Sequence, residues 1–577
     1  MSRFVSRFIS RFISRFVSST TPASPTRRTR PLPLSGVLRA GRPSDIWFKP
    51  ALSGLVAVAP PNLTLVALDR LDLAMYTMAG SLCALYAHNR PYRARAGVLA
   101  LVVLGMLGGL AVALLTASLT TNALLLVAVG ALLAAVQKAL CDATRIGPPG
   151  NVVLTFVSSA ALFAPQTAGR VPGHLALCLA AGAWAWLVGM APALVRPHGP
   201  ERRATAQALT AAAAHVEAAA AGDGTHARAA AAAAVQAAWG TVLTAGARST
   251  TRSALELLVV RAEVALAAPA DTDPARLRTW ARALRGTGPV PVPEGEHTAA
   301  TRELLGVDVE LAAPRPPLRR TITALAPIAT RTALGCALAG YASLAVGVGR
   351  PYWALVTAAA LYQANVTLTW SRGVQRVVGN LGGVLVFAAL VPLAHAGRLA
   401  LVLCCLALNF GAEALMSRNY WLGSLCVTPM ALLVVEFPGL KDPGVLMTER
   451  ATDTVIGALV GFVAAIAVTN RRAGDHLAHA LSAAERAREH TARLLAGPRT
   501  APAELAAARR TLAAALADLR ATADAASGEW WQRALPYERV VSAERTGHRT
   551  LAATVRRQGL SAGPDRGADD TTEDVRP

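Results

Sequence analysis

Two long, charge-poor apolar blocks constrain this chain more than any other feature. Residues 50–198 carry only eight basic and three acidic side chains, and residues 319–470 carry ten and five. The segments that follow them are rich in charge: residues 199–318 hold 12 basic and 12 acidic side chains, and residues 471–577 hold 17 and 14. Since about 20 apolar residues cross a bilayer as a helix, the alternation predicts a membrane–soluble–membrane–soluble layout.

Each block divides into six apolar segments near the length of a transmembrane helix. They cover 49–68, 72–88, 96–115, 120–140, 150–165 and 173–195 in the first block, and 325–348, 352–369, 374–395, 398–416, 420–436 and 451–470 in the second. We predict an all-α membrane protein with two parallel six-helix transmembrane repeats, about 12 spans, each followed by a helical cytoplasmic domain. The predicted parts are a basic tail (1–48), transmembrane halves (49–196 and 321–470) and helical domains (197–320 and 471–577, with a disordered end at 559–577).

Composition excludes several classes of protein. Charged residues make up 16% of the chain and hydrophobic residues 53%, whereas soluble domains carry about a quarter charged residues. A disordered chain, a disulfide scaffold and an ordinary soluble enzyme are therefore excluded. The net charge of +22 fits the cytoplasmic flanks of membrane spans and needs no nucleic acid as partner.

The short loops predict the orientation. If the basic N-terminus is cytoplasmic, the inner loops hold eight basic side chains and the outer loops five. This bias predicts a multi-pass plasma-membrane protein with both termini and the central domain in the cytoplasm. High Ala and Arg content with only three Lys is typical of a bacterial source with GC-rich DNA.

Patterns typical of cofactor sites and enzymes are missing from the sequence. The seven cysteines contain no CxxC pair and lie in or beside apolar stretches, so they are predicted to be buried hydrophobic side chains. His476 and His479 are too few for a zinc site. The chain has no GxxxxGK phosphate loop and no pattern typical of hydrolases. We predict no cofactor, no metal and no enzymatic activity.

The N-terminus repeats the tetrad Ser-Arg-Phe-Val/Ile four times, in residues 2–17. One interpretation is an amphipathic anchor on an anionic membrane surface, and the other is a disordered tail. A continuous apolar stretch is missing from residues 1–30, so a cleaved signal peptide is not expected.

A group of short motifs lies in the second apolar block. Arg350–Thr357 opens with Arg-Pro-Tyr-Trp-Ala, Gln363 follows, and Arg372 and Arg376 lead to Gly379–Gly383; the last span adds Thr448, Glu449, Arg450, Asp453, Gly457 and Gly461. These motifs and the layout of spans and domains closely resemble the fusaric acid resistance-like (FUSC) family, relatives of aromatic acid exporters. The resemblance implies export of organic, often aromatic, carboxylates. It also implies kinship with plant malate channels, in which two six-span subunits form one anion path.

Arg372 and Arg376 are the first candidates for lining a substrate path. They lie at i and i+4 on one face of an expected span, and Arg93 and Arg95 open the corresponding span of the first half. An arginine near the hydrocarbon core is costly unless it faces water, an anion or a partner, and its planar fork suits carboxylates. We predict that the four guanidinium groups ring an anion-selecting vestibule. The alternative is simple anchoring at the headgroups.

Other polar side chains in the spans have two interpretations each. Arg331, a few residues into the seventh span, is a second candidate for the path. Asp453 begins the last span, where it would carry protons, pair with Arg450 or cap the helix. Gln363 and Asn380 would line a polar path or bond neighbouring helices.

From the sequence we predict a transporter that exports small organic, above all aromatic, carboxylates without hydrolysing ATP. The expected partners are the small organic anion and the lipid bilayer, and an oligomer is left open. A passive anion channel is the first alternative. A membrane scaffold with cytoplasmic interaction domains is the second.

Overall fold

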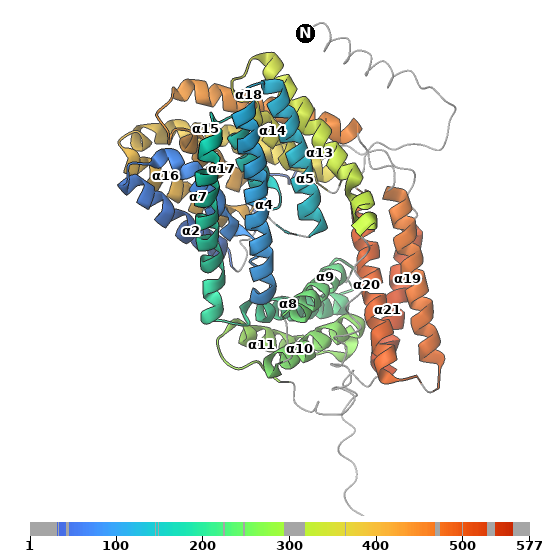
Figure 1. Ribbon diagram of the computed structural model, residues 1–577. Helices are drawn as coiled ribbons and strands as arrows, with labels where there is room; N and C mark the ends of the chain where they lie inside the picture. Colours follow the sequence, from blue (N-terminus) through green and yellow to red (C-terminus); the bar gives the residue numbers. More distant parts are fainter. Residues whose placement is uncertain are drawn as a thin grey trace, which may run out of the picture.

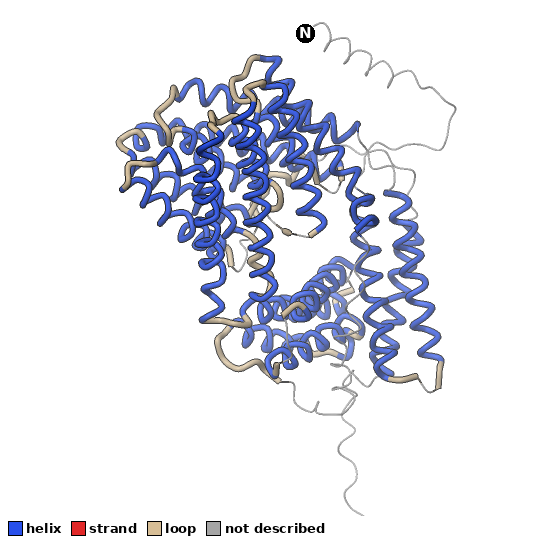
Figure 2. The backbone as a smooth tube through the Cα atoms, viewed as in Figure 1, coloured by secondary structure: helices blue, strands red, loops and turns tan. Residues whose placement is uncertain are grey.

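The residues that the structure describes fold into helices joined by short loops (Figure 1). Figure 2 shows the backbone coloured by secondary structure, and the described residues contain helices and loops but no strand. The computed structural model describes residues 32, 34–41, 46–144, 146–147, 149–222, 225–245, 249–292, 318–363, 365–467, 473–498, 500–527 and 537–557. The tetrad repeat of residues 2–17 and the end segment 559–577 lie outside these ranges.

Helices follow both apolar blocks. The first block forms α2 (Phe48–Ala67), η1 (Leu71–Leu73), α3 (Ala74–Ser81), η2 (Leu82–Leu85), α4 (Tyr92–Leu119), α5 (Ala123–Ala143), α6 (Val152–Leu162) and α7 (Val171–Met190). The second block forms α13 (Leu318–Val346), α14 (Tyr352–Leu361), α15 (Val366–Ala394), α16 (Arg398–Met416), α17 (Tyr420–Val435) and α18 (Pro443–Ala467). All twelve expected apolar segments therefore overlap a helix or a run of short helices.

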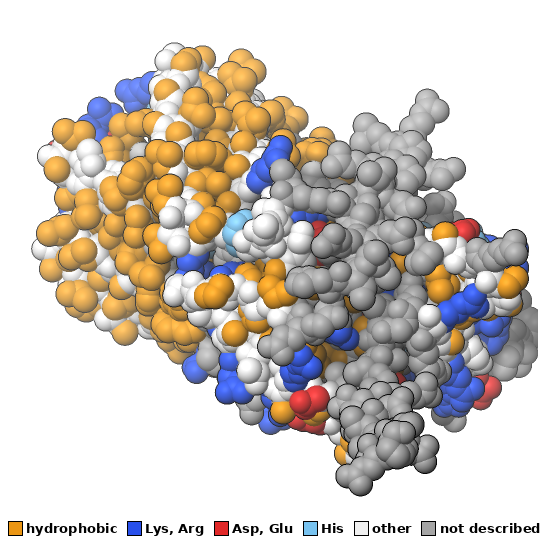
Figure 3. Space-filling view, turned by 90° about the horizontal axis from the view of Figure 1, so that it is seen from below, with side chains coloured by type: hydrophobic (Ala, Val, Ile, Leu, Met, Phe, Trp, Pro, Cys, Tyr) orange, Lys and Arg blue, Asp and Glu red, His pale blue; other side chains and the backbone are white. Residues whose placement is uncertain are grey.

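These helices pack into one apolar bundle. Seven segments are long and apolar enough to cross a membrane: α2, α4, α5, α15, α16, α18 and the run Ala168–Leu194 that contains α7. Four shorter apolar segments, Leu71–Leu85, α6, α14 and α17, are the second and fifth of each block. Large side chains such as Leu132, Leu385 and Leu459 are more than half exposed, and in Figure 3 hydrophobic side chains cover the bundle. The protein is thus an all-α membrane protein.

Two helix boundaries in the second block differ from those expected. The segment 352–369 is not one helix, because α14 ends at Leu361 and α15 begins at Val366. The Asn365 side chain accepts a hydrogen bond from the Leu368 amide at 2.8 Å and caps the new helix. The last helix begins at Pro443, eight residues before the expected start, since proline suits the first turn of a helix. Gln363 therefore lies in a break, and Arg450 lies inside a helix.

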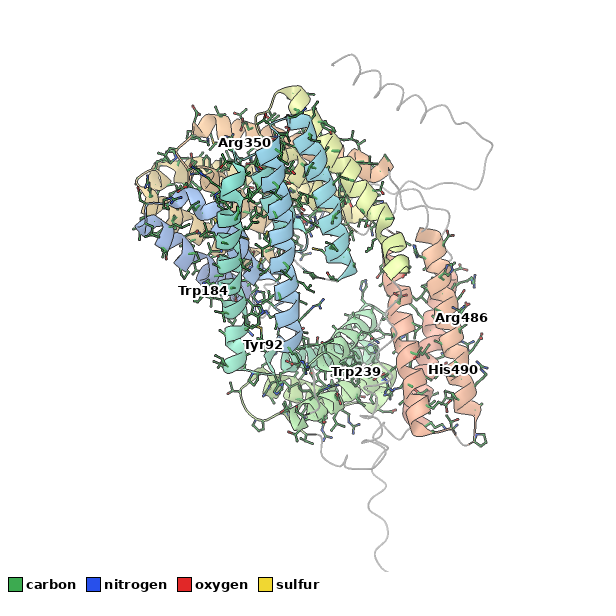
Figure 4. The ribbon with its side chains drawn as sticks, viewed as in Figure 1. Tyr92, Trp184, Trp239, Arg350, Arg486 and His490 are labelled. Atoms are coloured by element: carbon green, nitrogen blue, oxygen red, sulfur yellow. The ribbon has the colours of Figure 1, made fainter. Side chains whose placement is uncertain are left out.

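Two helical domains lie at one end of the bundle (Figure 1). The central helical domain is formed by α8 (Gly199–Ala220), α9 (Thr225–Leu243), α10 (Thr250–Ala267) and α11 (Pro274–Arg285), and the C-terminal helical domain by α19 (Ala473–Ala496), α20 (Pro502–Ser527) and α21 (Tyr537–Arg557). Arg203 of α8 donates to Asn89 in the loop before α4 at 3.2 Å. We call this end of the bundle the domain end and the opposite end the free end. Figure 4 shows Tyr92 near the domain end and Arg350 near the free end.

Small residues allow the closest helix contacts. Gly80 of α3 packs against the backbone of α7 at Cys178 and Gly182, and Gly457 of α18 packs against Ala354 of α14. A Cβ atom at Gly80 would overlap backbone atoms of α7, which no side-chain rotation relieves. Close approach at small residues is a main source of helix association in membranes, because lipid offers no hydrophobic driving force.

Gly80→Val should therefore destabilise the bundle strongly, by more than the 1–3 kcal/mol typical of overpacking. Gly105→Val is the matched control, since nothing lies within 4 Å of a Cβ at Gly105 in α4. The measurement is the thermal midpoint of each variant in detergent, followed by size-exclusion chromatography. Equal midpoints for the two variants would contradict the packing argument.

The two helical domains meet around buried histidines. His215 of α8 is fully buried, and Arg228 of α9 and His548 of α21 interact with it electrostatically. Burial, with smaller contributions from Arg228 and His215, lowers the pKa of His548 to about 4. The unfolded chain takes up this proton near pH 6.5. Stability is therefore complete above that pH and is lost as the pH falls from 6.5 towards 4.

We expect His548→Gln to reduce this loss of stability in acid. At pH 5 the wild-type domains should be less stable than at pH 7.5 by about 2 kcal/mol on account of His548. His490 of α19, an exposed histidine labelled in Figure 4, provides the matched control His490→Gln. Thermal unfolding at the two pH values checks this. A pH response that is identical in wild type and His548→Gln would show that His548 does not contribute.

Candidate functional site

A cavity of about 2600 Å³ lies between the helices of the two blocks. Its wall includes Arg170 and Arg350 near the free end and Arg90 and Lys138 near the domain end. The cavity thus extends along the bundle from one end to the other. Arginine and lysine outnumber carboxylates on the wall, with Arg70, Arg90, Lys138, Arg170, Arg203, Arg350, Arg372, Arg376, Lys441 and Arg450 against Asp72, Glu413 and Glu449.

Two arginines of α15 meet one tyrosine of α17 on this wall. Arg376 donates from Nη1 to the Tyr420 hydroxyl at 2.6 Å, and the Arg372 guanidinium lies 4.0 Å from the centre of the Tyr420 ring. The helical spacing of four residues places both guanidinium groups on one face of α15. Arg376 is only 5% exposed. The phenol therefore holds two cations at the cavity surface.

A third arginine approaches the same region from α18. The Arg450 guanidinium lies 4.1 Å from the centre of the Trp353 ring, an arrangement that partly compensates a buried cation. Tyr352 stacks on Trp353 with ring centres 4.9 Å apart, and Phe156 and Phe163 of the first block approach this pair at 5.6 and 5.9 Å. Aromatic side chains of the first block thus pack on the Tyr352–Trp353 pair, whose indole lies against Arg450.

Several guanidinium donors here point to no protein acceptor. Among the described residues, Nε of Arg376 and both Nε and Nη1 of Arg450 are buried without a hydrogen-bond partner. The two charges lie close enough to repel each other. The wall carboxylate Glu449 is occupied by Arg350, with which it forms an ion pair. Asp453 also interacts electrostatically with Arg450. Guanidinium donors without a protein partner and an excess of positive charge on the wall fit an anion with oxygen acceptors, such as a carboxylate.

The four arginines expected to form a ring lie in different surroundings. Arg372 and Arg376 are on the cavity wall. Arg93 is exposed, and Arg95 is buried with its Nη2 3.1 Å from Nδ1 of His88, which is itself a wall residue. Arg95 therefore contacts the cavity only through His88. The structure brings two of the four guanidinium groups together.

The other predicted residues are divided between the wall and the helix contacts. Gln363 is on the wall, in the break between α14 and α15. Asn380 is buried off the wall, where it donates to Thr454 at 3.1 Å and accepts from Thr428 at 2.9 Å, joining α15, α18 and α17. Such a bond network holds helices in register.

Asp453 and Arg331 are both buried, and neither lines the cavity. Asp453 is fully buried and accepts a hydrogen bond from Ser343 of α13 at 2.5 Å. Arg331 is 4% exposed and lies close enough to Tyr362, a wall residue, for its charge to act on the phenol.

Sequence reasoning missed Arg450 and Tyr420 as wall residues. Arg450 was predicted only as a motif residue and a pairing partner of Asp453, because the last span was expected to begin at 451, whereas α18 begins at Pro443. The proline at 443 was the signal for the earlier start. No sequence signal placed Tyr420 under Arg372 and Arg376, because that contact joins two helices more than 40 residues apart.

A comparison with known protein families matches part of the second apolar block. Residues 336–464 match the model of the family described as fusaric acid resistance protein-like. The protein is a membrane protein with a fusaric acid resistance protein-like domain. This domain contains α14 to α17 and nearly all of α18, and hence Arg372, Arg376, Tyr420 and Arg450. The resemblance drawn from the sequence motifs is thereby confirmed.

A curated protein is similar to this chain over a stretch about as long as the family match. Over 131 residues, or 22% of this chain, the sequence is 31% identical to an uncharacterized membrane protein, YvaC, of Bacillus subtilis (strain 168). The match spans about a fifth of that protein, 21% of its length. No solved structure matches the chain.

Asn380→Ala should destabilise the fold while leaving substrate affinity unchanged. The substitution leaves the Thr428 hydroxyl without its acceptor, at a cost of about 1–3 kcal/mol. Thermal midpoints in detergent measure the first effect, and the KM for transport of a probe carboxylate measures the second. A raised KM with an unchanged midpoint would place Asn380 on the path instead.

Proposed function

We propose that the protein exports small organic carboxylates, above all aromatic ones, through the cavity and without hydrolysing ATP. The observation that carries this proposal is the pair Arg376 and Arg450, two arginines on the wall of a cavity inside an apolar bundle, each with buried donors that have no hydrogen-bond partner. An arginine in a membrane is costly, so its placement there favours a role in the path of an anion.

The wall suits both parts of an aromatic acid. The guanidinium groups of Arg376 and Arg450 would take the carboxylate, and the rings of Phe156, Phe163 and Tyr352 line the same cavity. Ring-on-ring contact contributes about 0.5–1.5 kcal/mol beyond simple burial. A wall with few free carboxylates also repels cations. The donor set therefore selects the charge, and the aromatic side chains favour a flat substrate.

The bundle is proposed to consist of two parallel repeats, 49–196 and 321–470, with twelve spans in total. Packing supports this pairing, because α2 packs on α16 of the other half while α5 packs on α13, and these are the first and fourth segments of each half. The second and fifth segments are the short ones in both halves. Short segments at matching positions are typical of transporter binding sites.

The domain end is proposed to face the bacterial cytoplasm, with both termini and the domains 197–320 and 471–577 on that side. The positive-inside bias of the loops supports this orientation. Anions leaving the cell would then gain about 2.3 kcal/mol per charge for each 100 mV of membrane potential. A proton gradient would add to this driving force if transport is coupled.

A passive anion channel is the second candidate. It is favoured by wall residues at both ends of the same cavity, such as Arg90 and Arg350. The two candidates differ in how a proton gradient acts. Flux through a channel follows the electrochemical gradient of the anion alone, whereas a coupled exporter also responds to an imposed pH difference at constant potential.

Efflux of benzoate from proteoliposomes tests the proposal. We expect Arg376→Gln and Arg450→Gln each to raise the KM or lower the rate by about tenfold or more, since charge-assisted bonds contribute about 1.5–3 kcal/mol. Arg93→Gln is the matched control, because Arg93 is exposed and off the wall. No benzoate flux above that of empty liposomes, or equal effects of all three variants, would contradict the proposal.

A further inference from the structure

A short segment before the first membrane helix is fixed to the domain end of the bundle. We call residues 34–41 the strap. The Asn419 amide donates to the carbonyls of Val37 and Arg39 at 3.0 and 3.1 Å, and the Gln375 amide donates to the same Val37 carbonyl at 3.0 Å. The sequence predicted only a basic tail here, because the contacts join residues more than 330 positions apart.

Further bonds hold the strap along the same loop. The Trp421 indole donates to the Leu38 carbonyl at 3.0 Å, and the Gly41 amide donates to the Arg418 carbonyl at 2.9 Å. Gly36 turns the strap with φ at +82°, a conformation that other residues rarely adopt. Val37 is 8% exposed, whereas Leu34 is 67% exposed. The strap is therefore docked at Val37 and open at Leu34.

The Val37 carbonyl links α15 to the start of α17, next to the contact between Arg376 and Tyr420. Gln375 precedes Arg376 on α15, and Asn419 precedes Tyr420, the phenol that accepts the Arg376 hydrogen bond. Gln375 and Asn419 are both on the cavity wall. The Val37 carbonyl thus accepts one hydrogen bond from α15 and another from Asn419 at the start of α17. The relative position of α15 and α17 sets the contact between Arg376 and Tyr420.

We propose that Gln375 and Asn419 are positioning residues that act through the strap, which fixes α15 against α17 and so sets the anion site at Arg376 and Tyr420. The inference rests on the proposed function for its transport readout, but docking of the strap is tested without transport. Main-chain carbonyls are suitable anchors because their geometry does not depend on rotamers. Loss of the strap should weaken substrate binding more than it slows turnover.

Labelling with a hydrophilic maleimide in detergent tests docking. Val37→Cys should react at least tenfold more slowly than the matched variant Leu34→Cys in the same strap. Of the native cysteines, six are buried and Cys426 is partly exposed, so the parent protein gives the background. Adding Gln375→Met and Asn419→Ser should bring the Val37→Cys rate towards that of Leu34→Cys. Equal rates without those substitutions would overturn the docked strap.

Benzoate efflux tests the positioning role. A protein lacking residues 1–41 should show a KM raised about three- to tenfold, as expected for one or two lost hydrogen bonds, with kcat changed less than twofold. A protein lacking residues 1–31 keeps the strap and is the control, expected to match the full chain. Gln375→Met should raise the KM in the full chain.

A double-mutant comparison separates the strap from direct contact with substrate. If Gln375 acts through the strap, Gln375→Met adds nothing in the protein lacking residues 1–41. The same loss in both backgrounds would overturn the proposal and place Gln375 in contact with substrate. Asn419→Ser is tested alongside, because serine keeps an oxygen to cap α17 in place of the Asn419 side chain, which accepts from the Trp421 amide.

The outcomes distinguish this inference from the proposed function. No benzoate flux in the full chain, with slow labelling at position 37, would reject the substrate proposal and leave the docked strap established. Benzoate flux with an unchanged KM after removal of residues 1–41 would reject the strap as a positioning device. Should that shortened protein fail to fold, Gln375→Met and Asn419→Ser in the full chain still give the KM-against-kcat result.

Discussion

Positive charge inside an apolar bundle is the constraint on which the rest of this structure depends. Arg376 and Arg450 lie on the wall of a cavity between helices whose outer faces carry leucine. The Tyr420 phenol partly compensates Arg372 and Arg376, and the Trp353 indole partly compensates Arg450. Because the cost of a buried cation is large, the cavity needs water or an anion beside these groups. A cavity of about 2600 Å³ provides room for both.

Close backbone contacts and buried hydrogen bonds hold the helices around the cavity together. Gly80 against α7 brings backbones together in the first block, and Gly457 against α14 does so in the second. Asn380 joins three helices of the second block by hydrogen bonds to hydroxyls. These contacts fix the wall so that its donors keep their directions, which is what selective binding of a small anion requires.

Outside the bundle, the structure joins distant parts of the chain at the domain end. The strap accepts hydrogen bonds from two residues of the cavity wall, Gln375 and Asn419. Helix α8 contacts the loop before α4 through Arg203 and Asn89. The two helical domains meet at His215 and His548, and burial lowers the pKa of both imidazoles.

Local sequence was sufficient for the elements and their class. The alternation of charge-poor and charge-rich blocks predicted twelve apolar segments, and each overlaps a helix or helical run of the structure. The family was also readable from short motifs in 350–383 and 448–461, and the family comparison covers residues 336–464. Burial was predicted correctly for six of the seven cysteines, whereas Cys426 is partly exposed. All these features depend on composition and on neighbours along the chain, which a sequence states directly.

The site was only half readable. Arg372 and Arg376 were identified from their spacing, since four residues apart on a helix means one face. Their equivalents in the first half could not be assigned in this way: Arg93 is exposed and Arg95 contacts His88, because helix rotation depends on packing partners. Tertiary structure alone decided that Tyr420, Arg450 and the Val37 carbonyl meet beside the cavity. The sequence determined which helices form and which charges they carry, whereas packing between helices far apart in the chain decided which of those charges face the cavity.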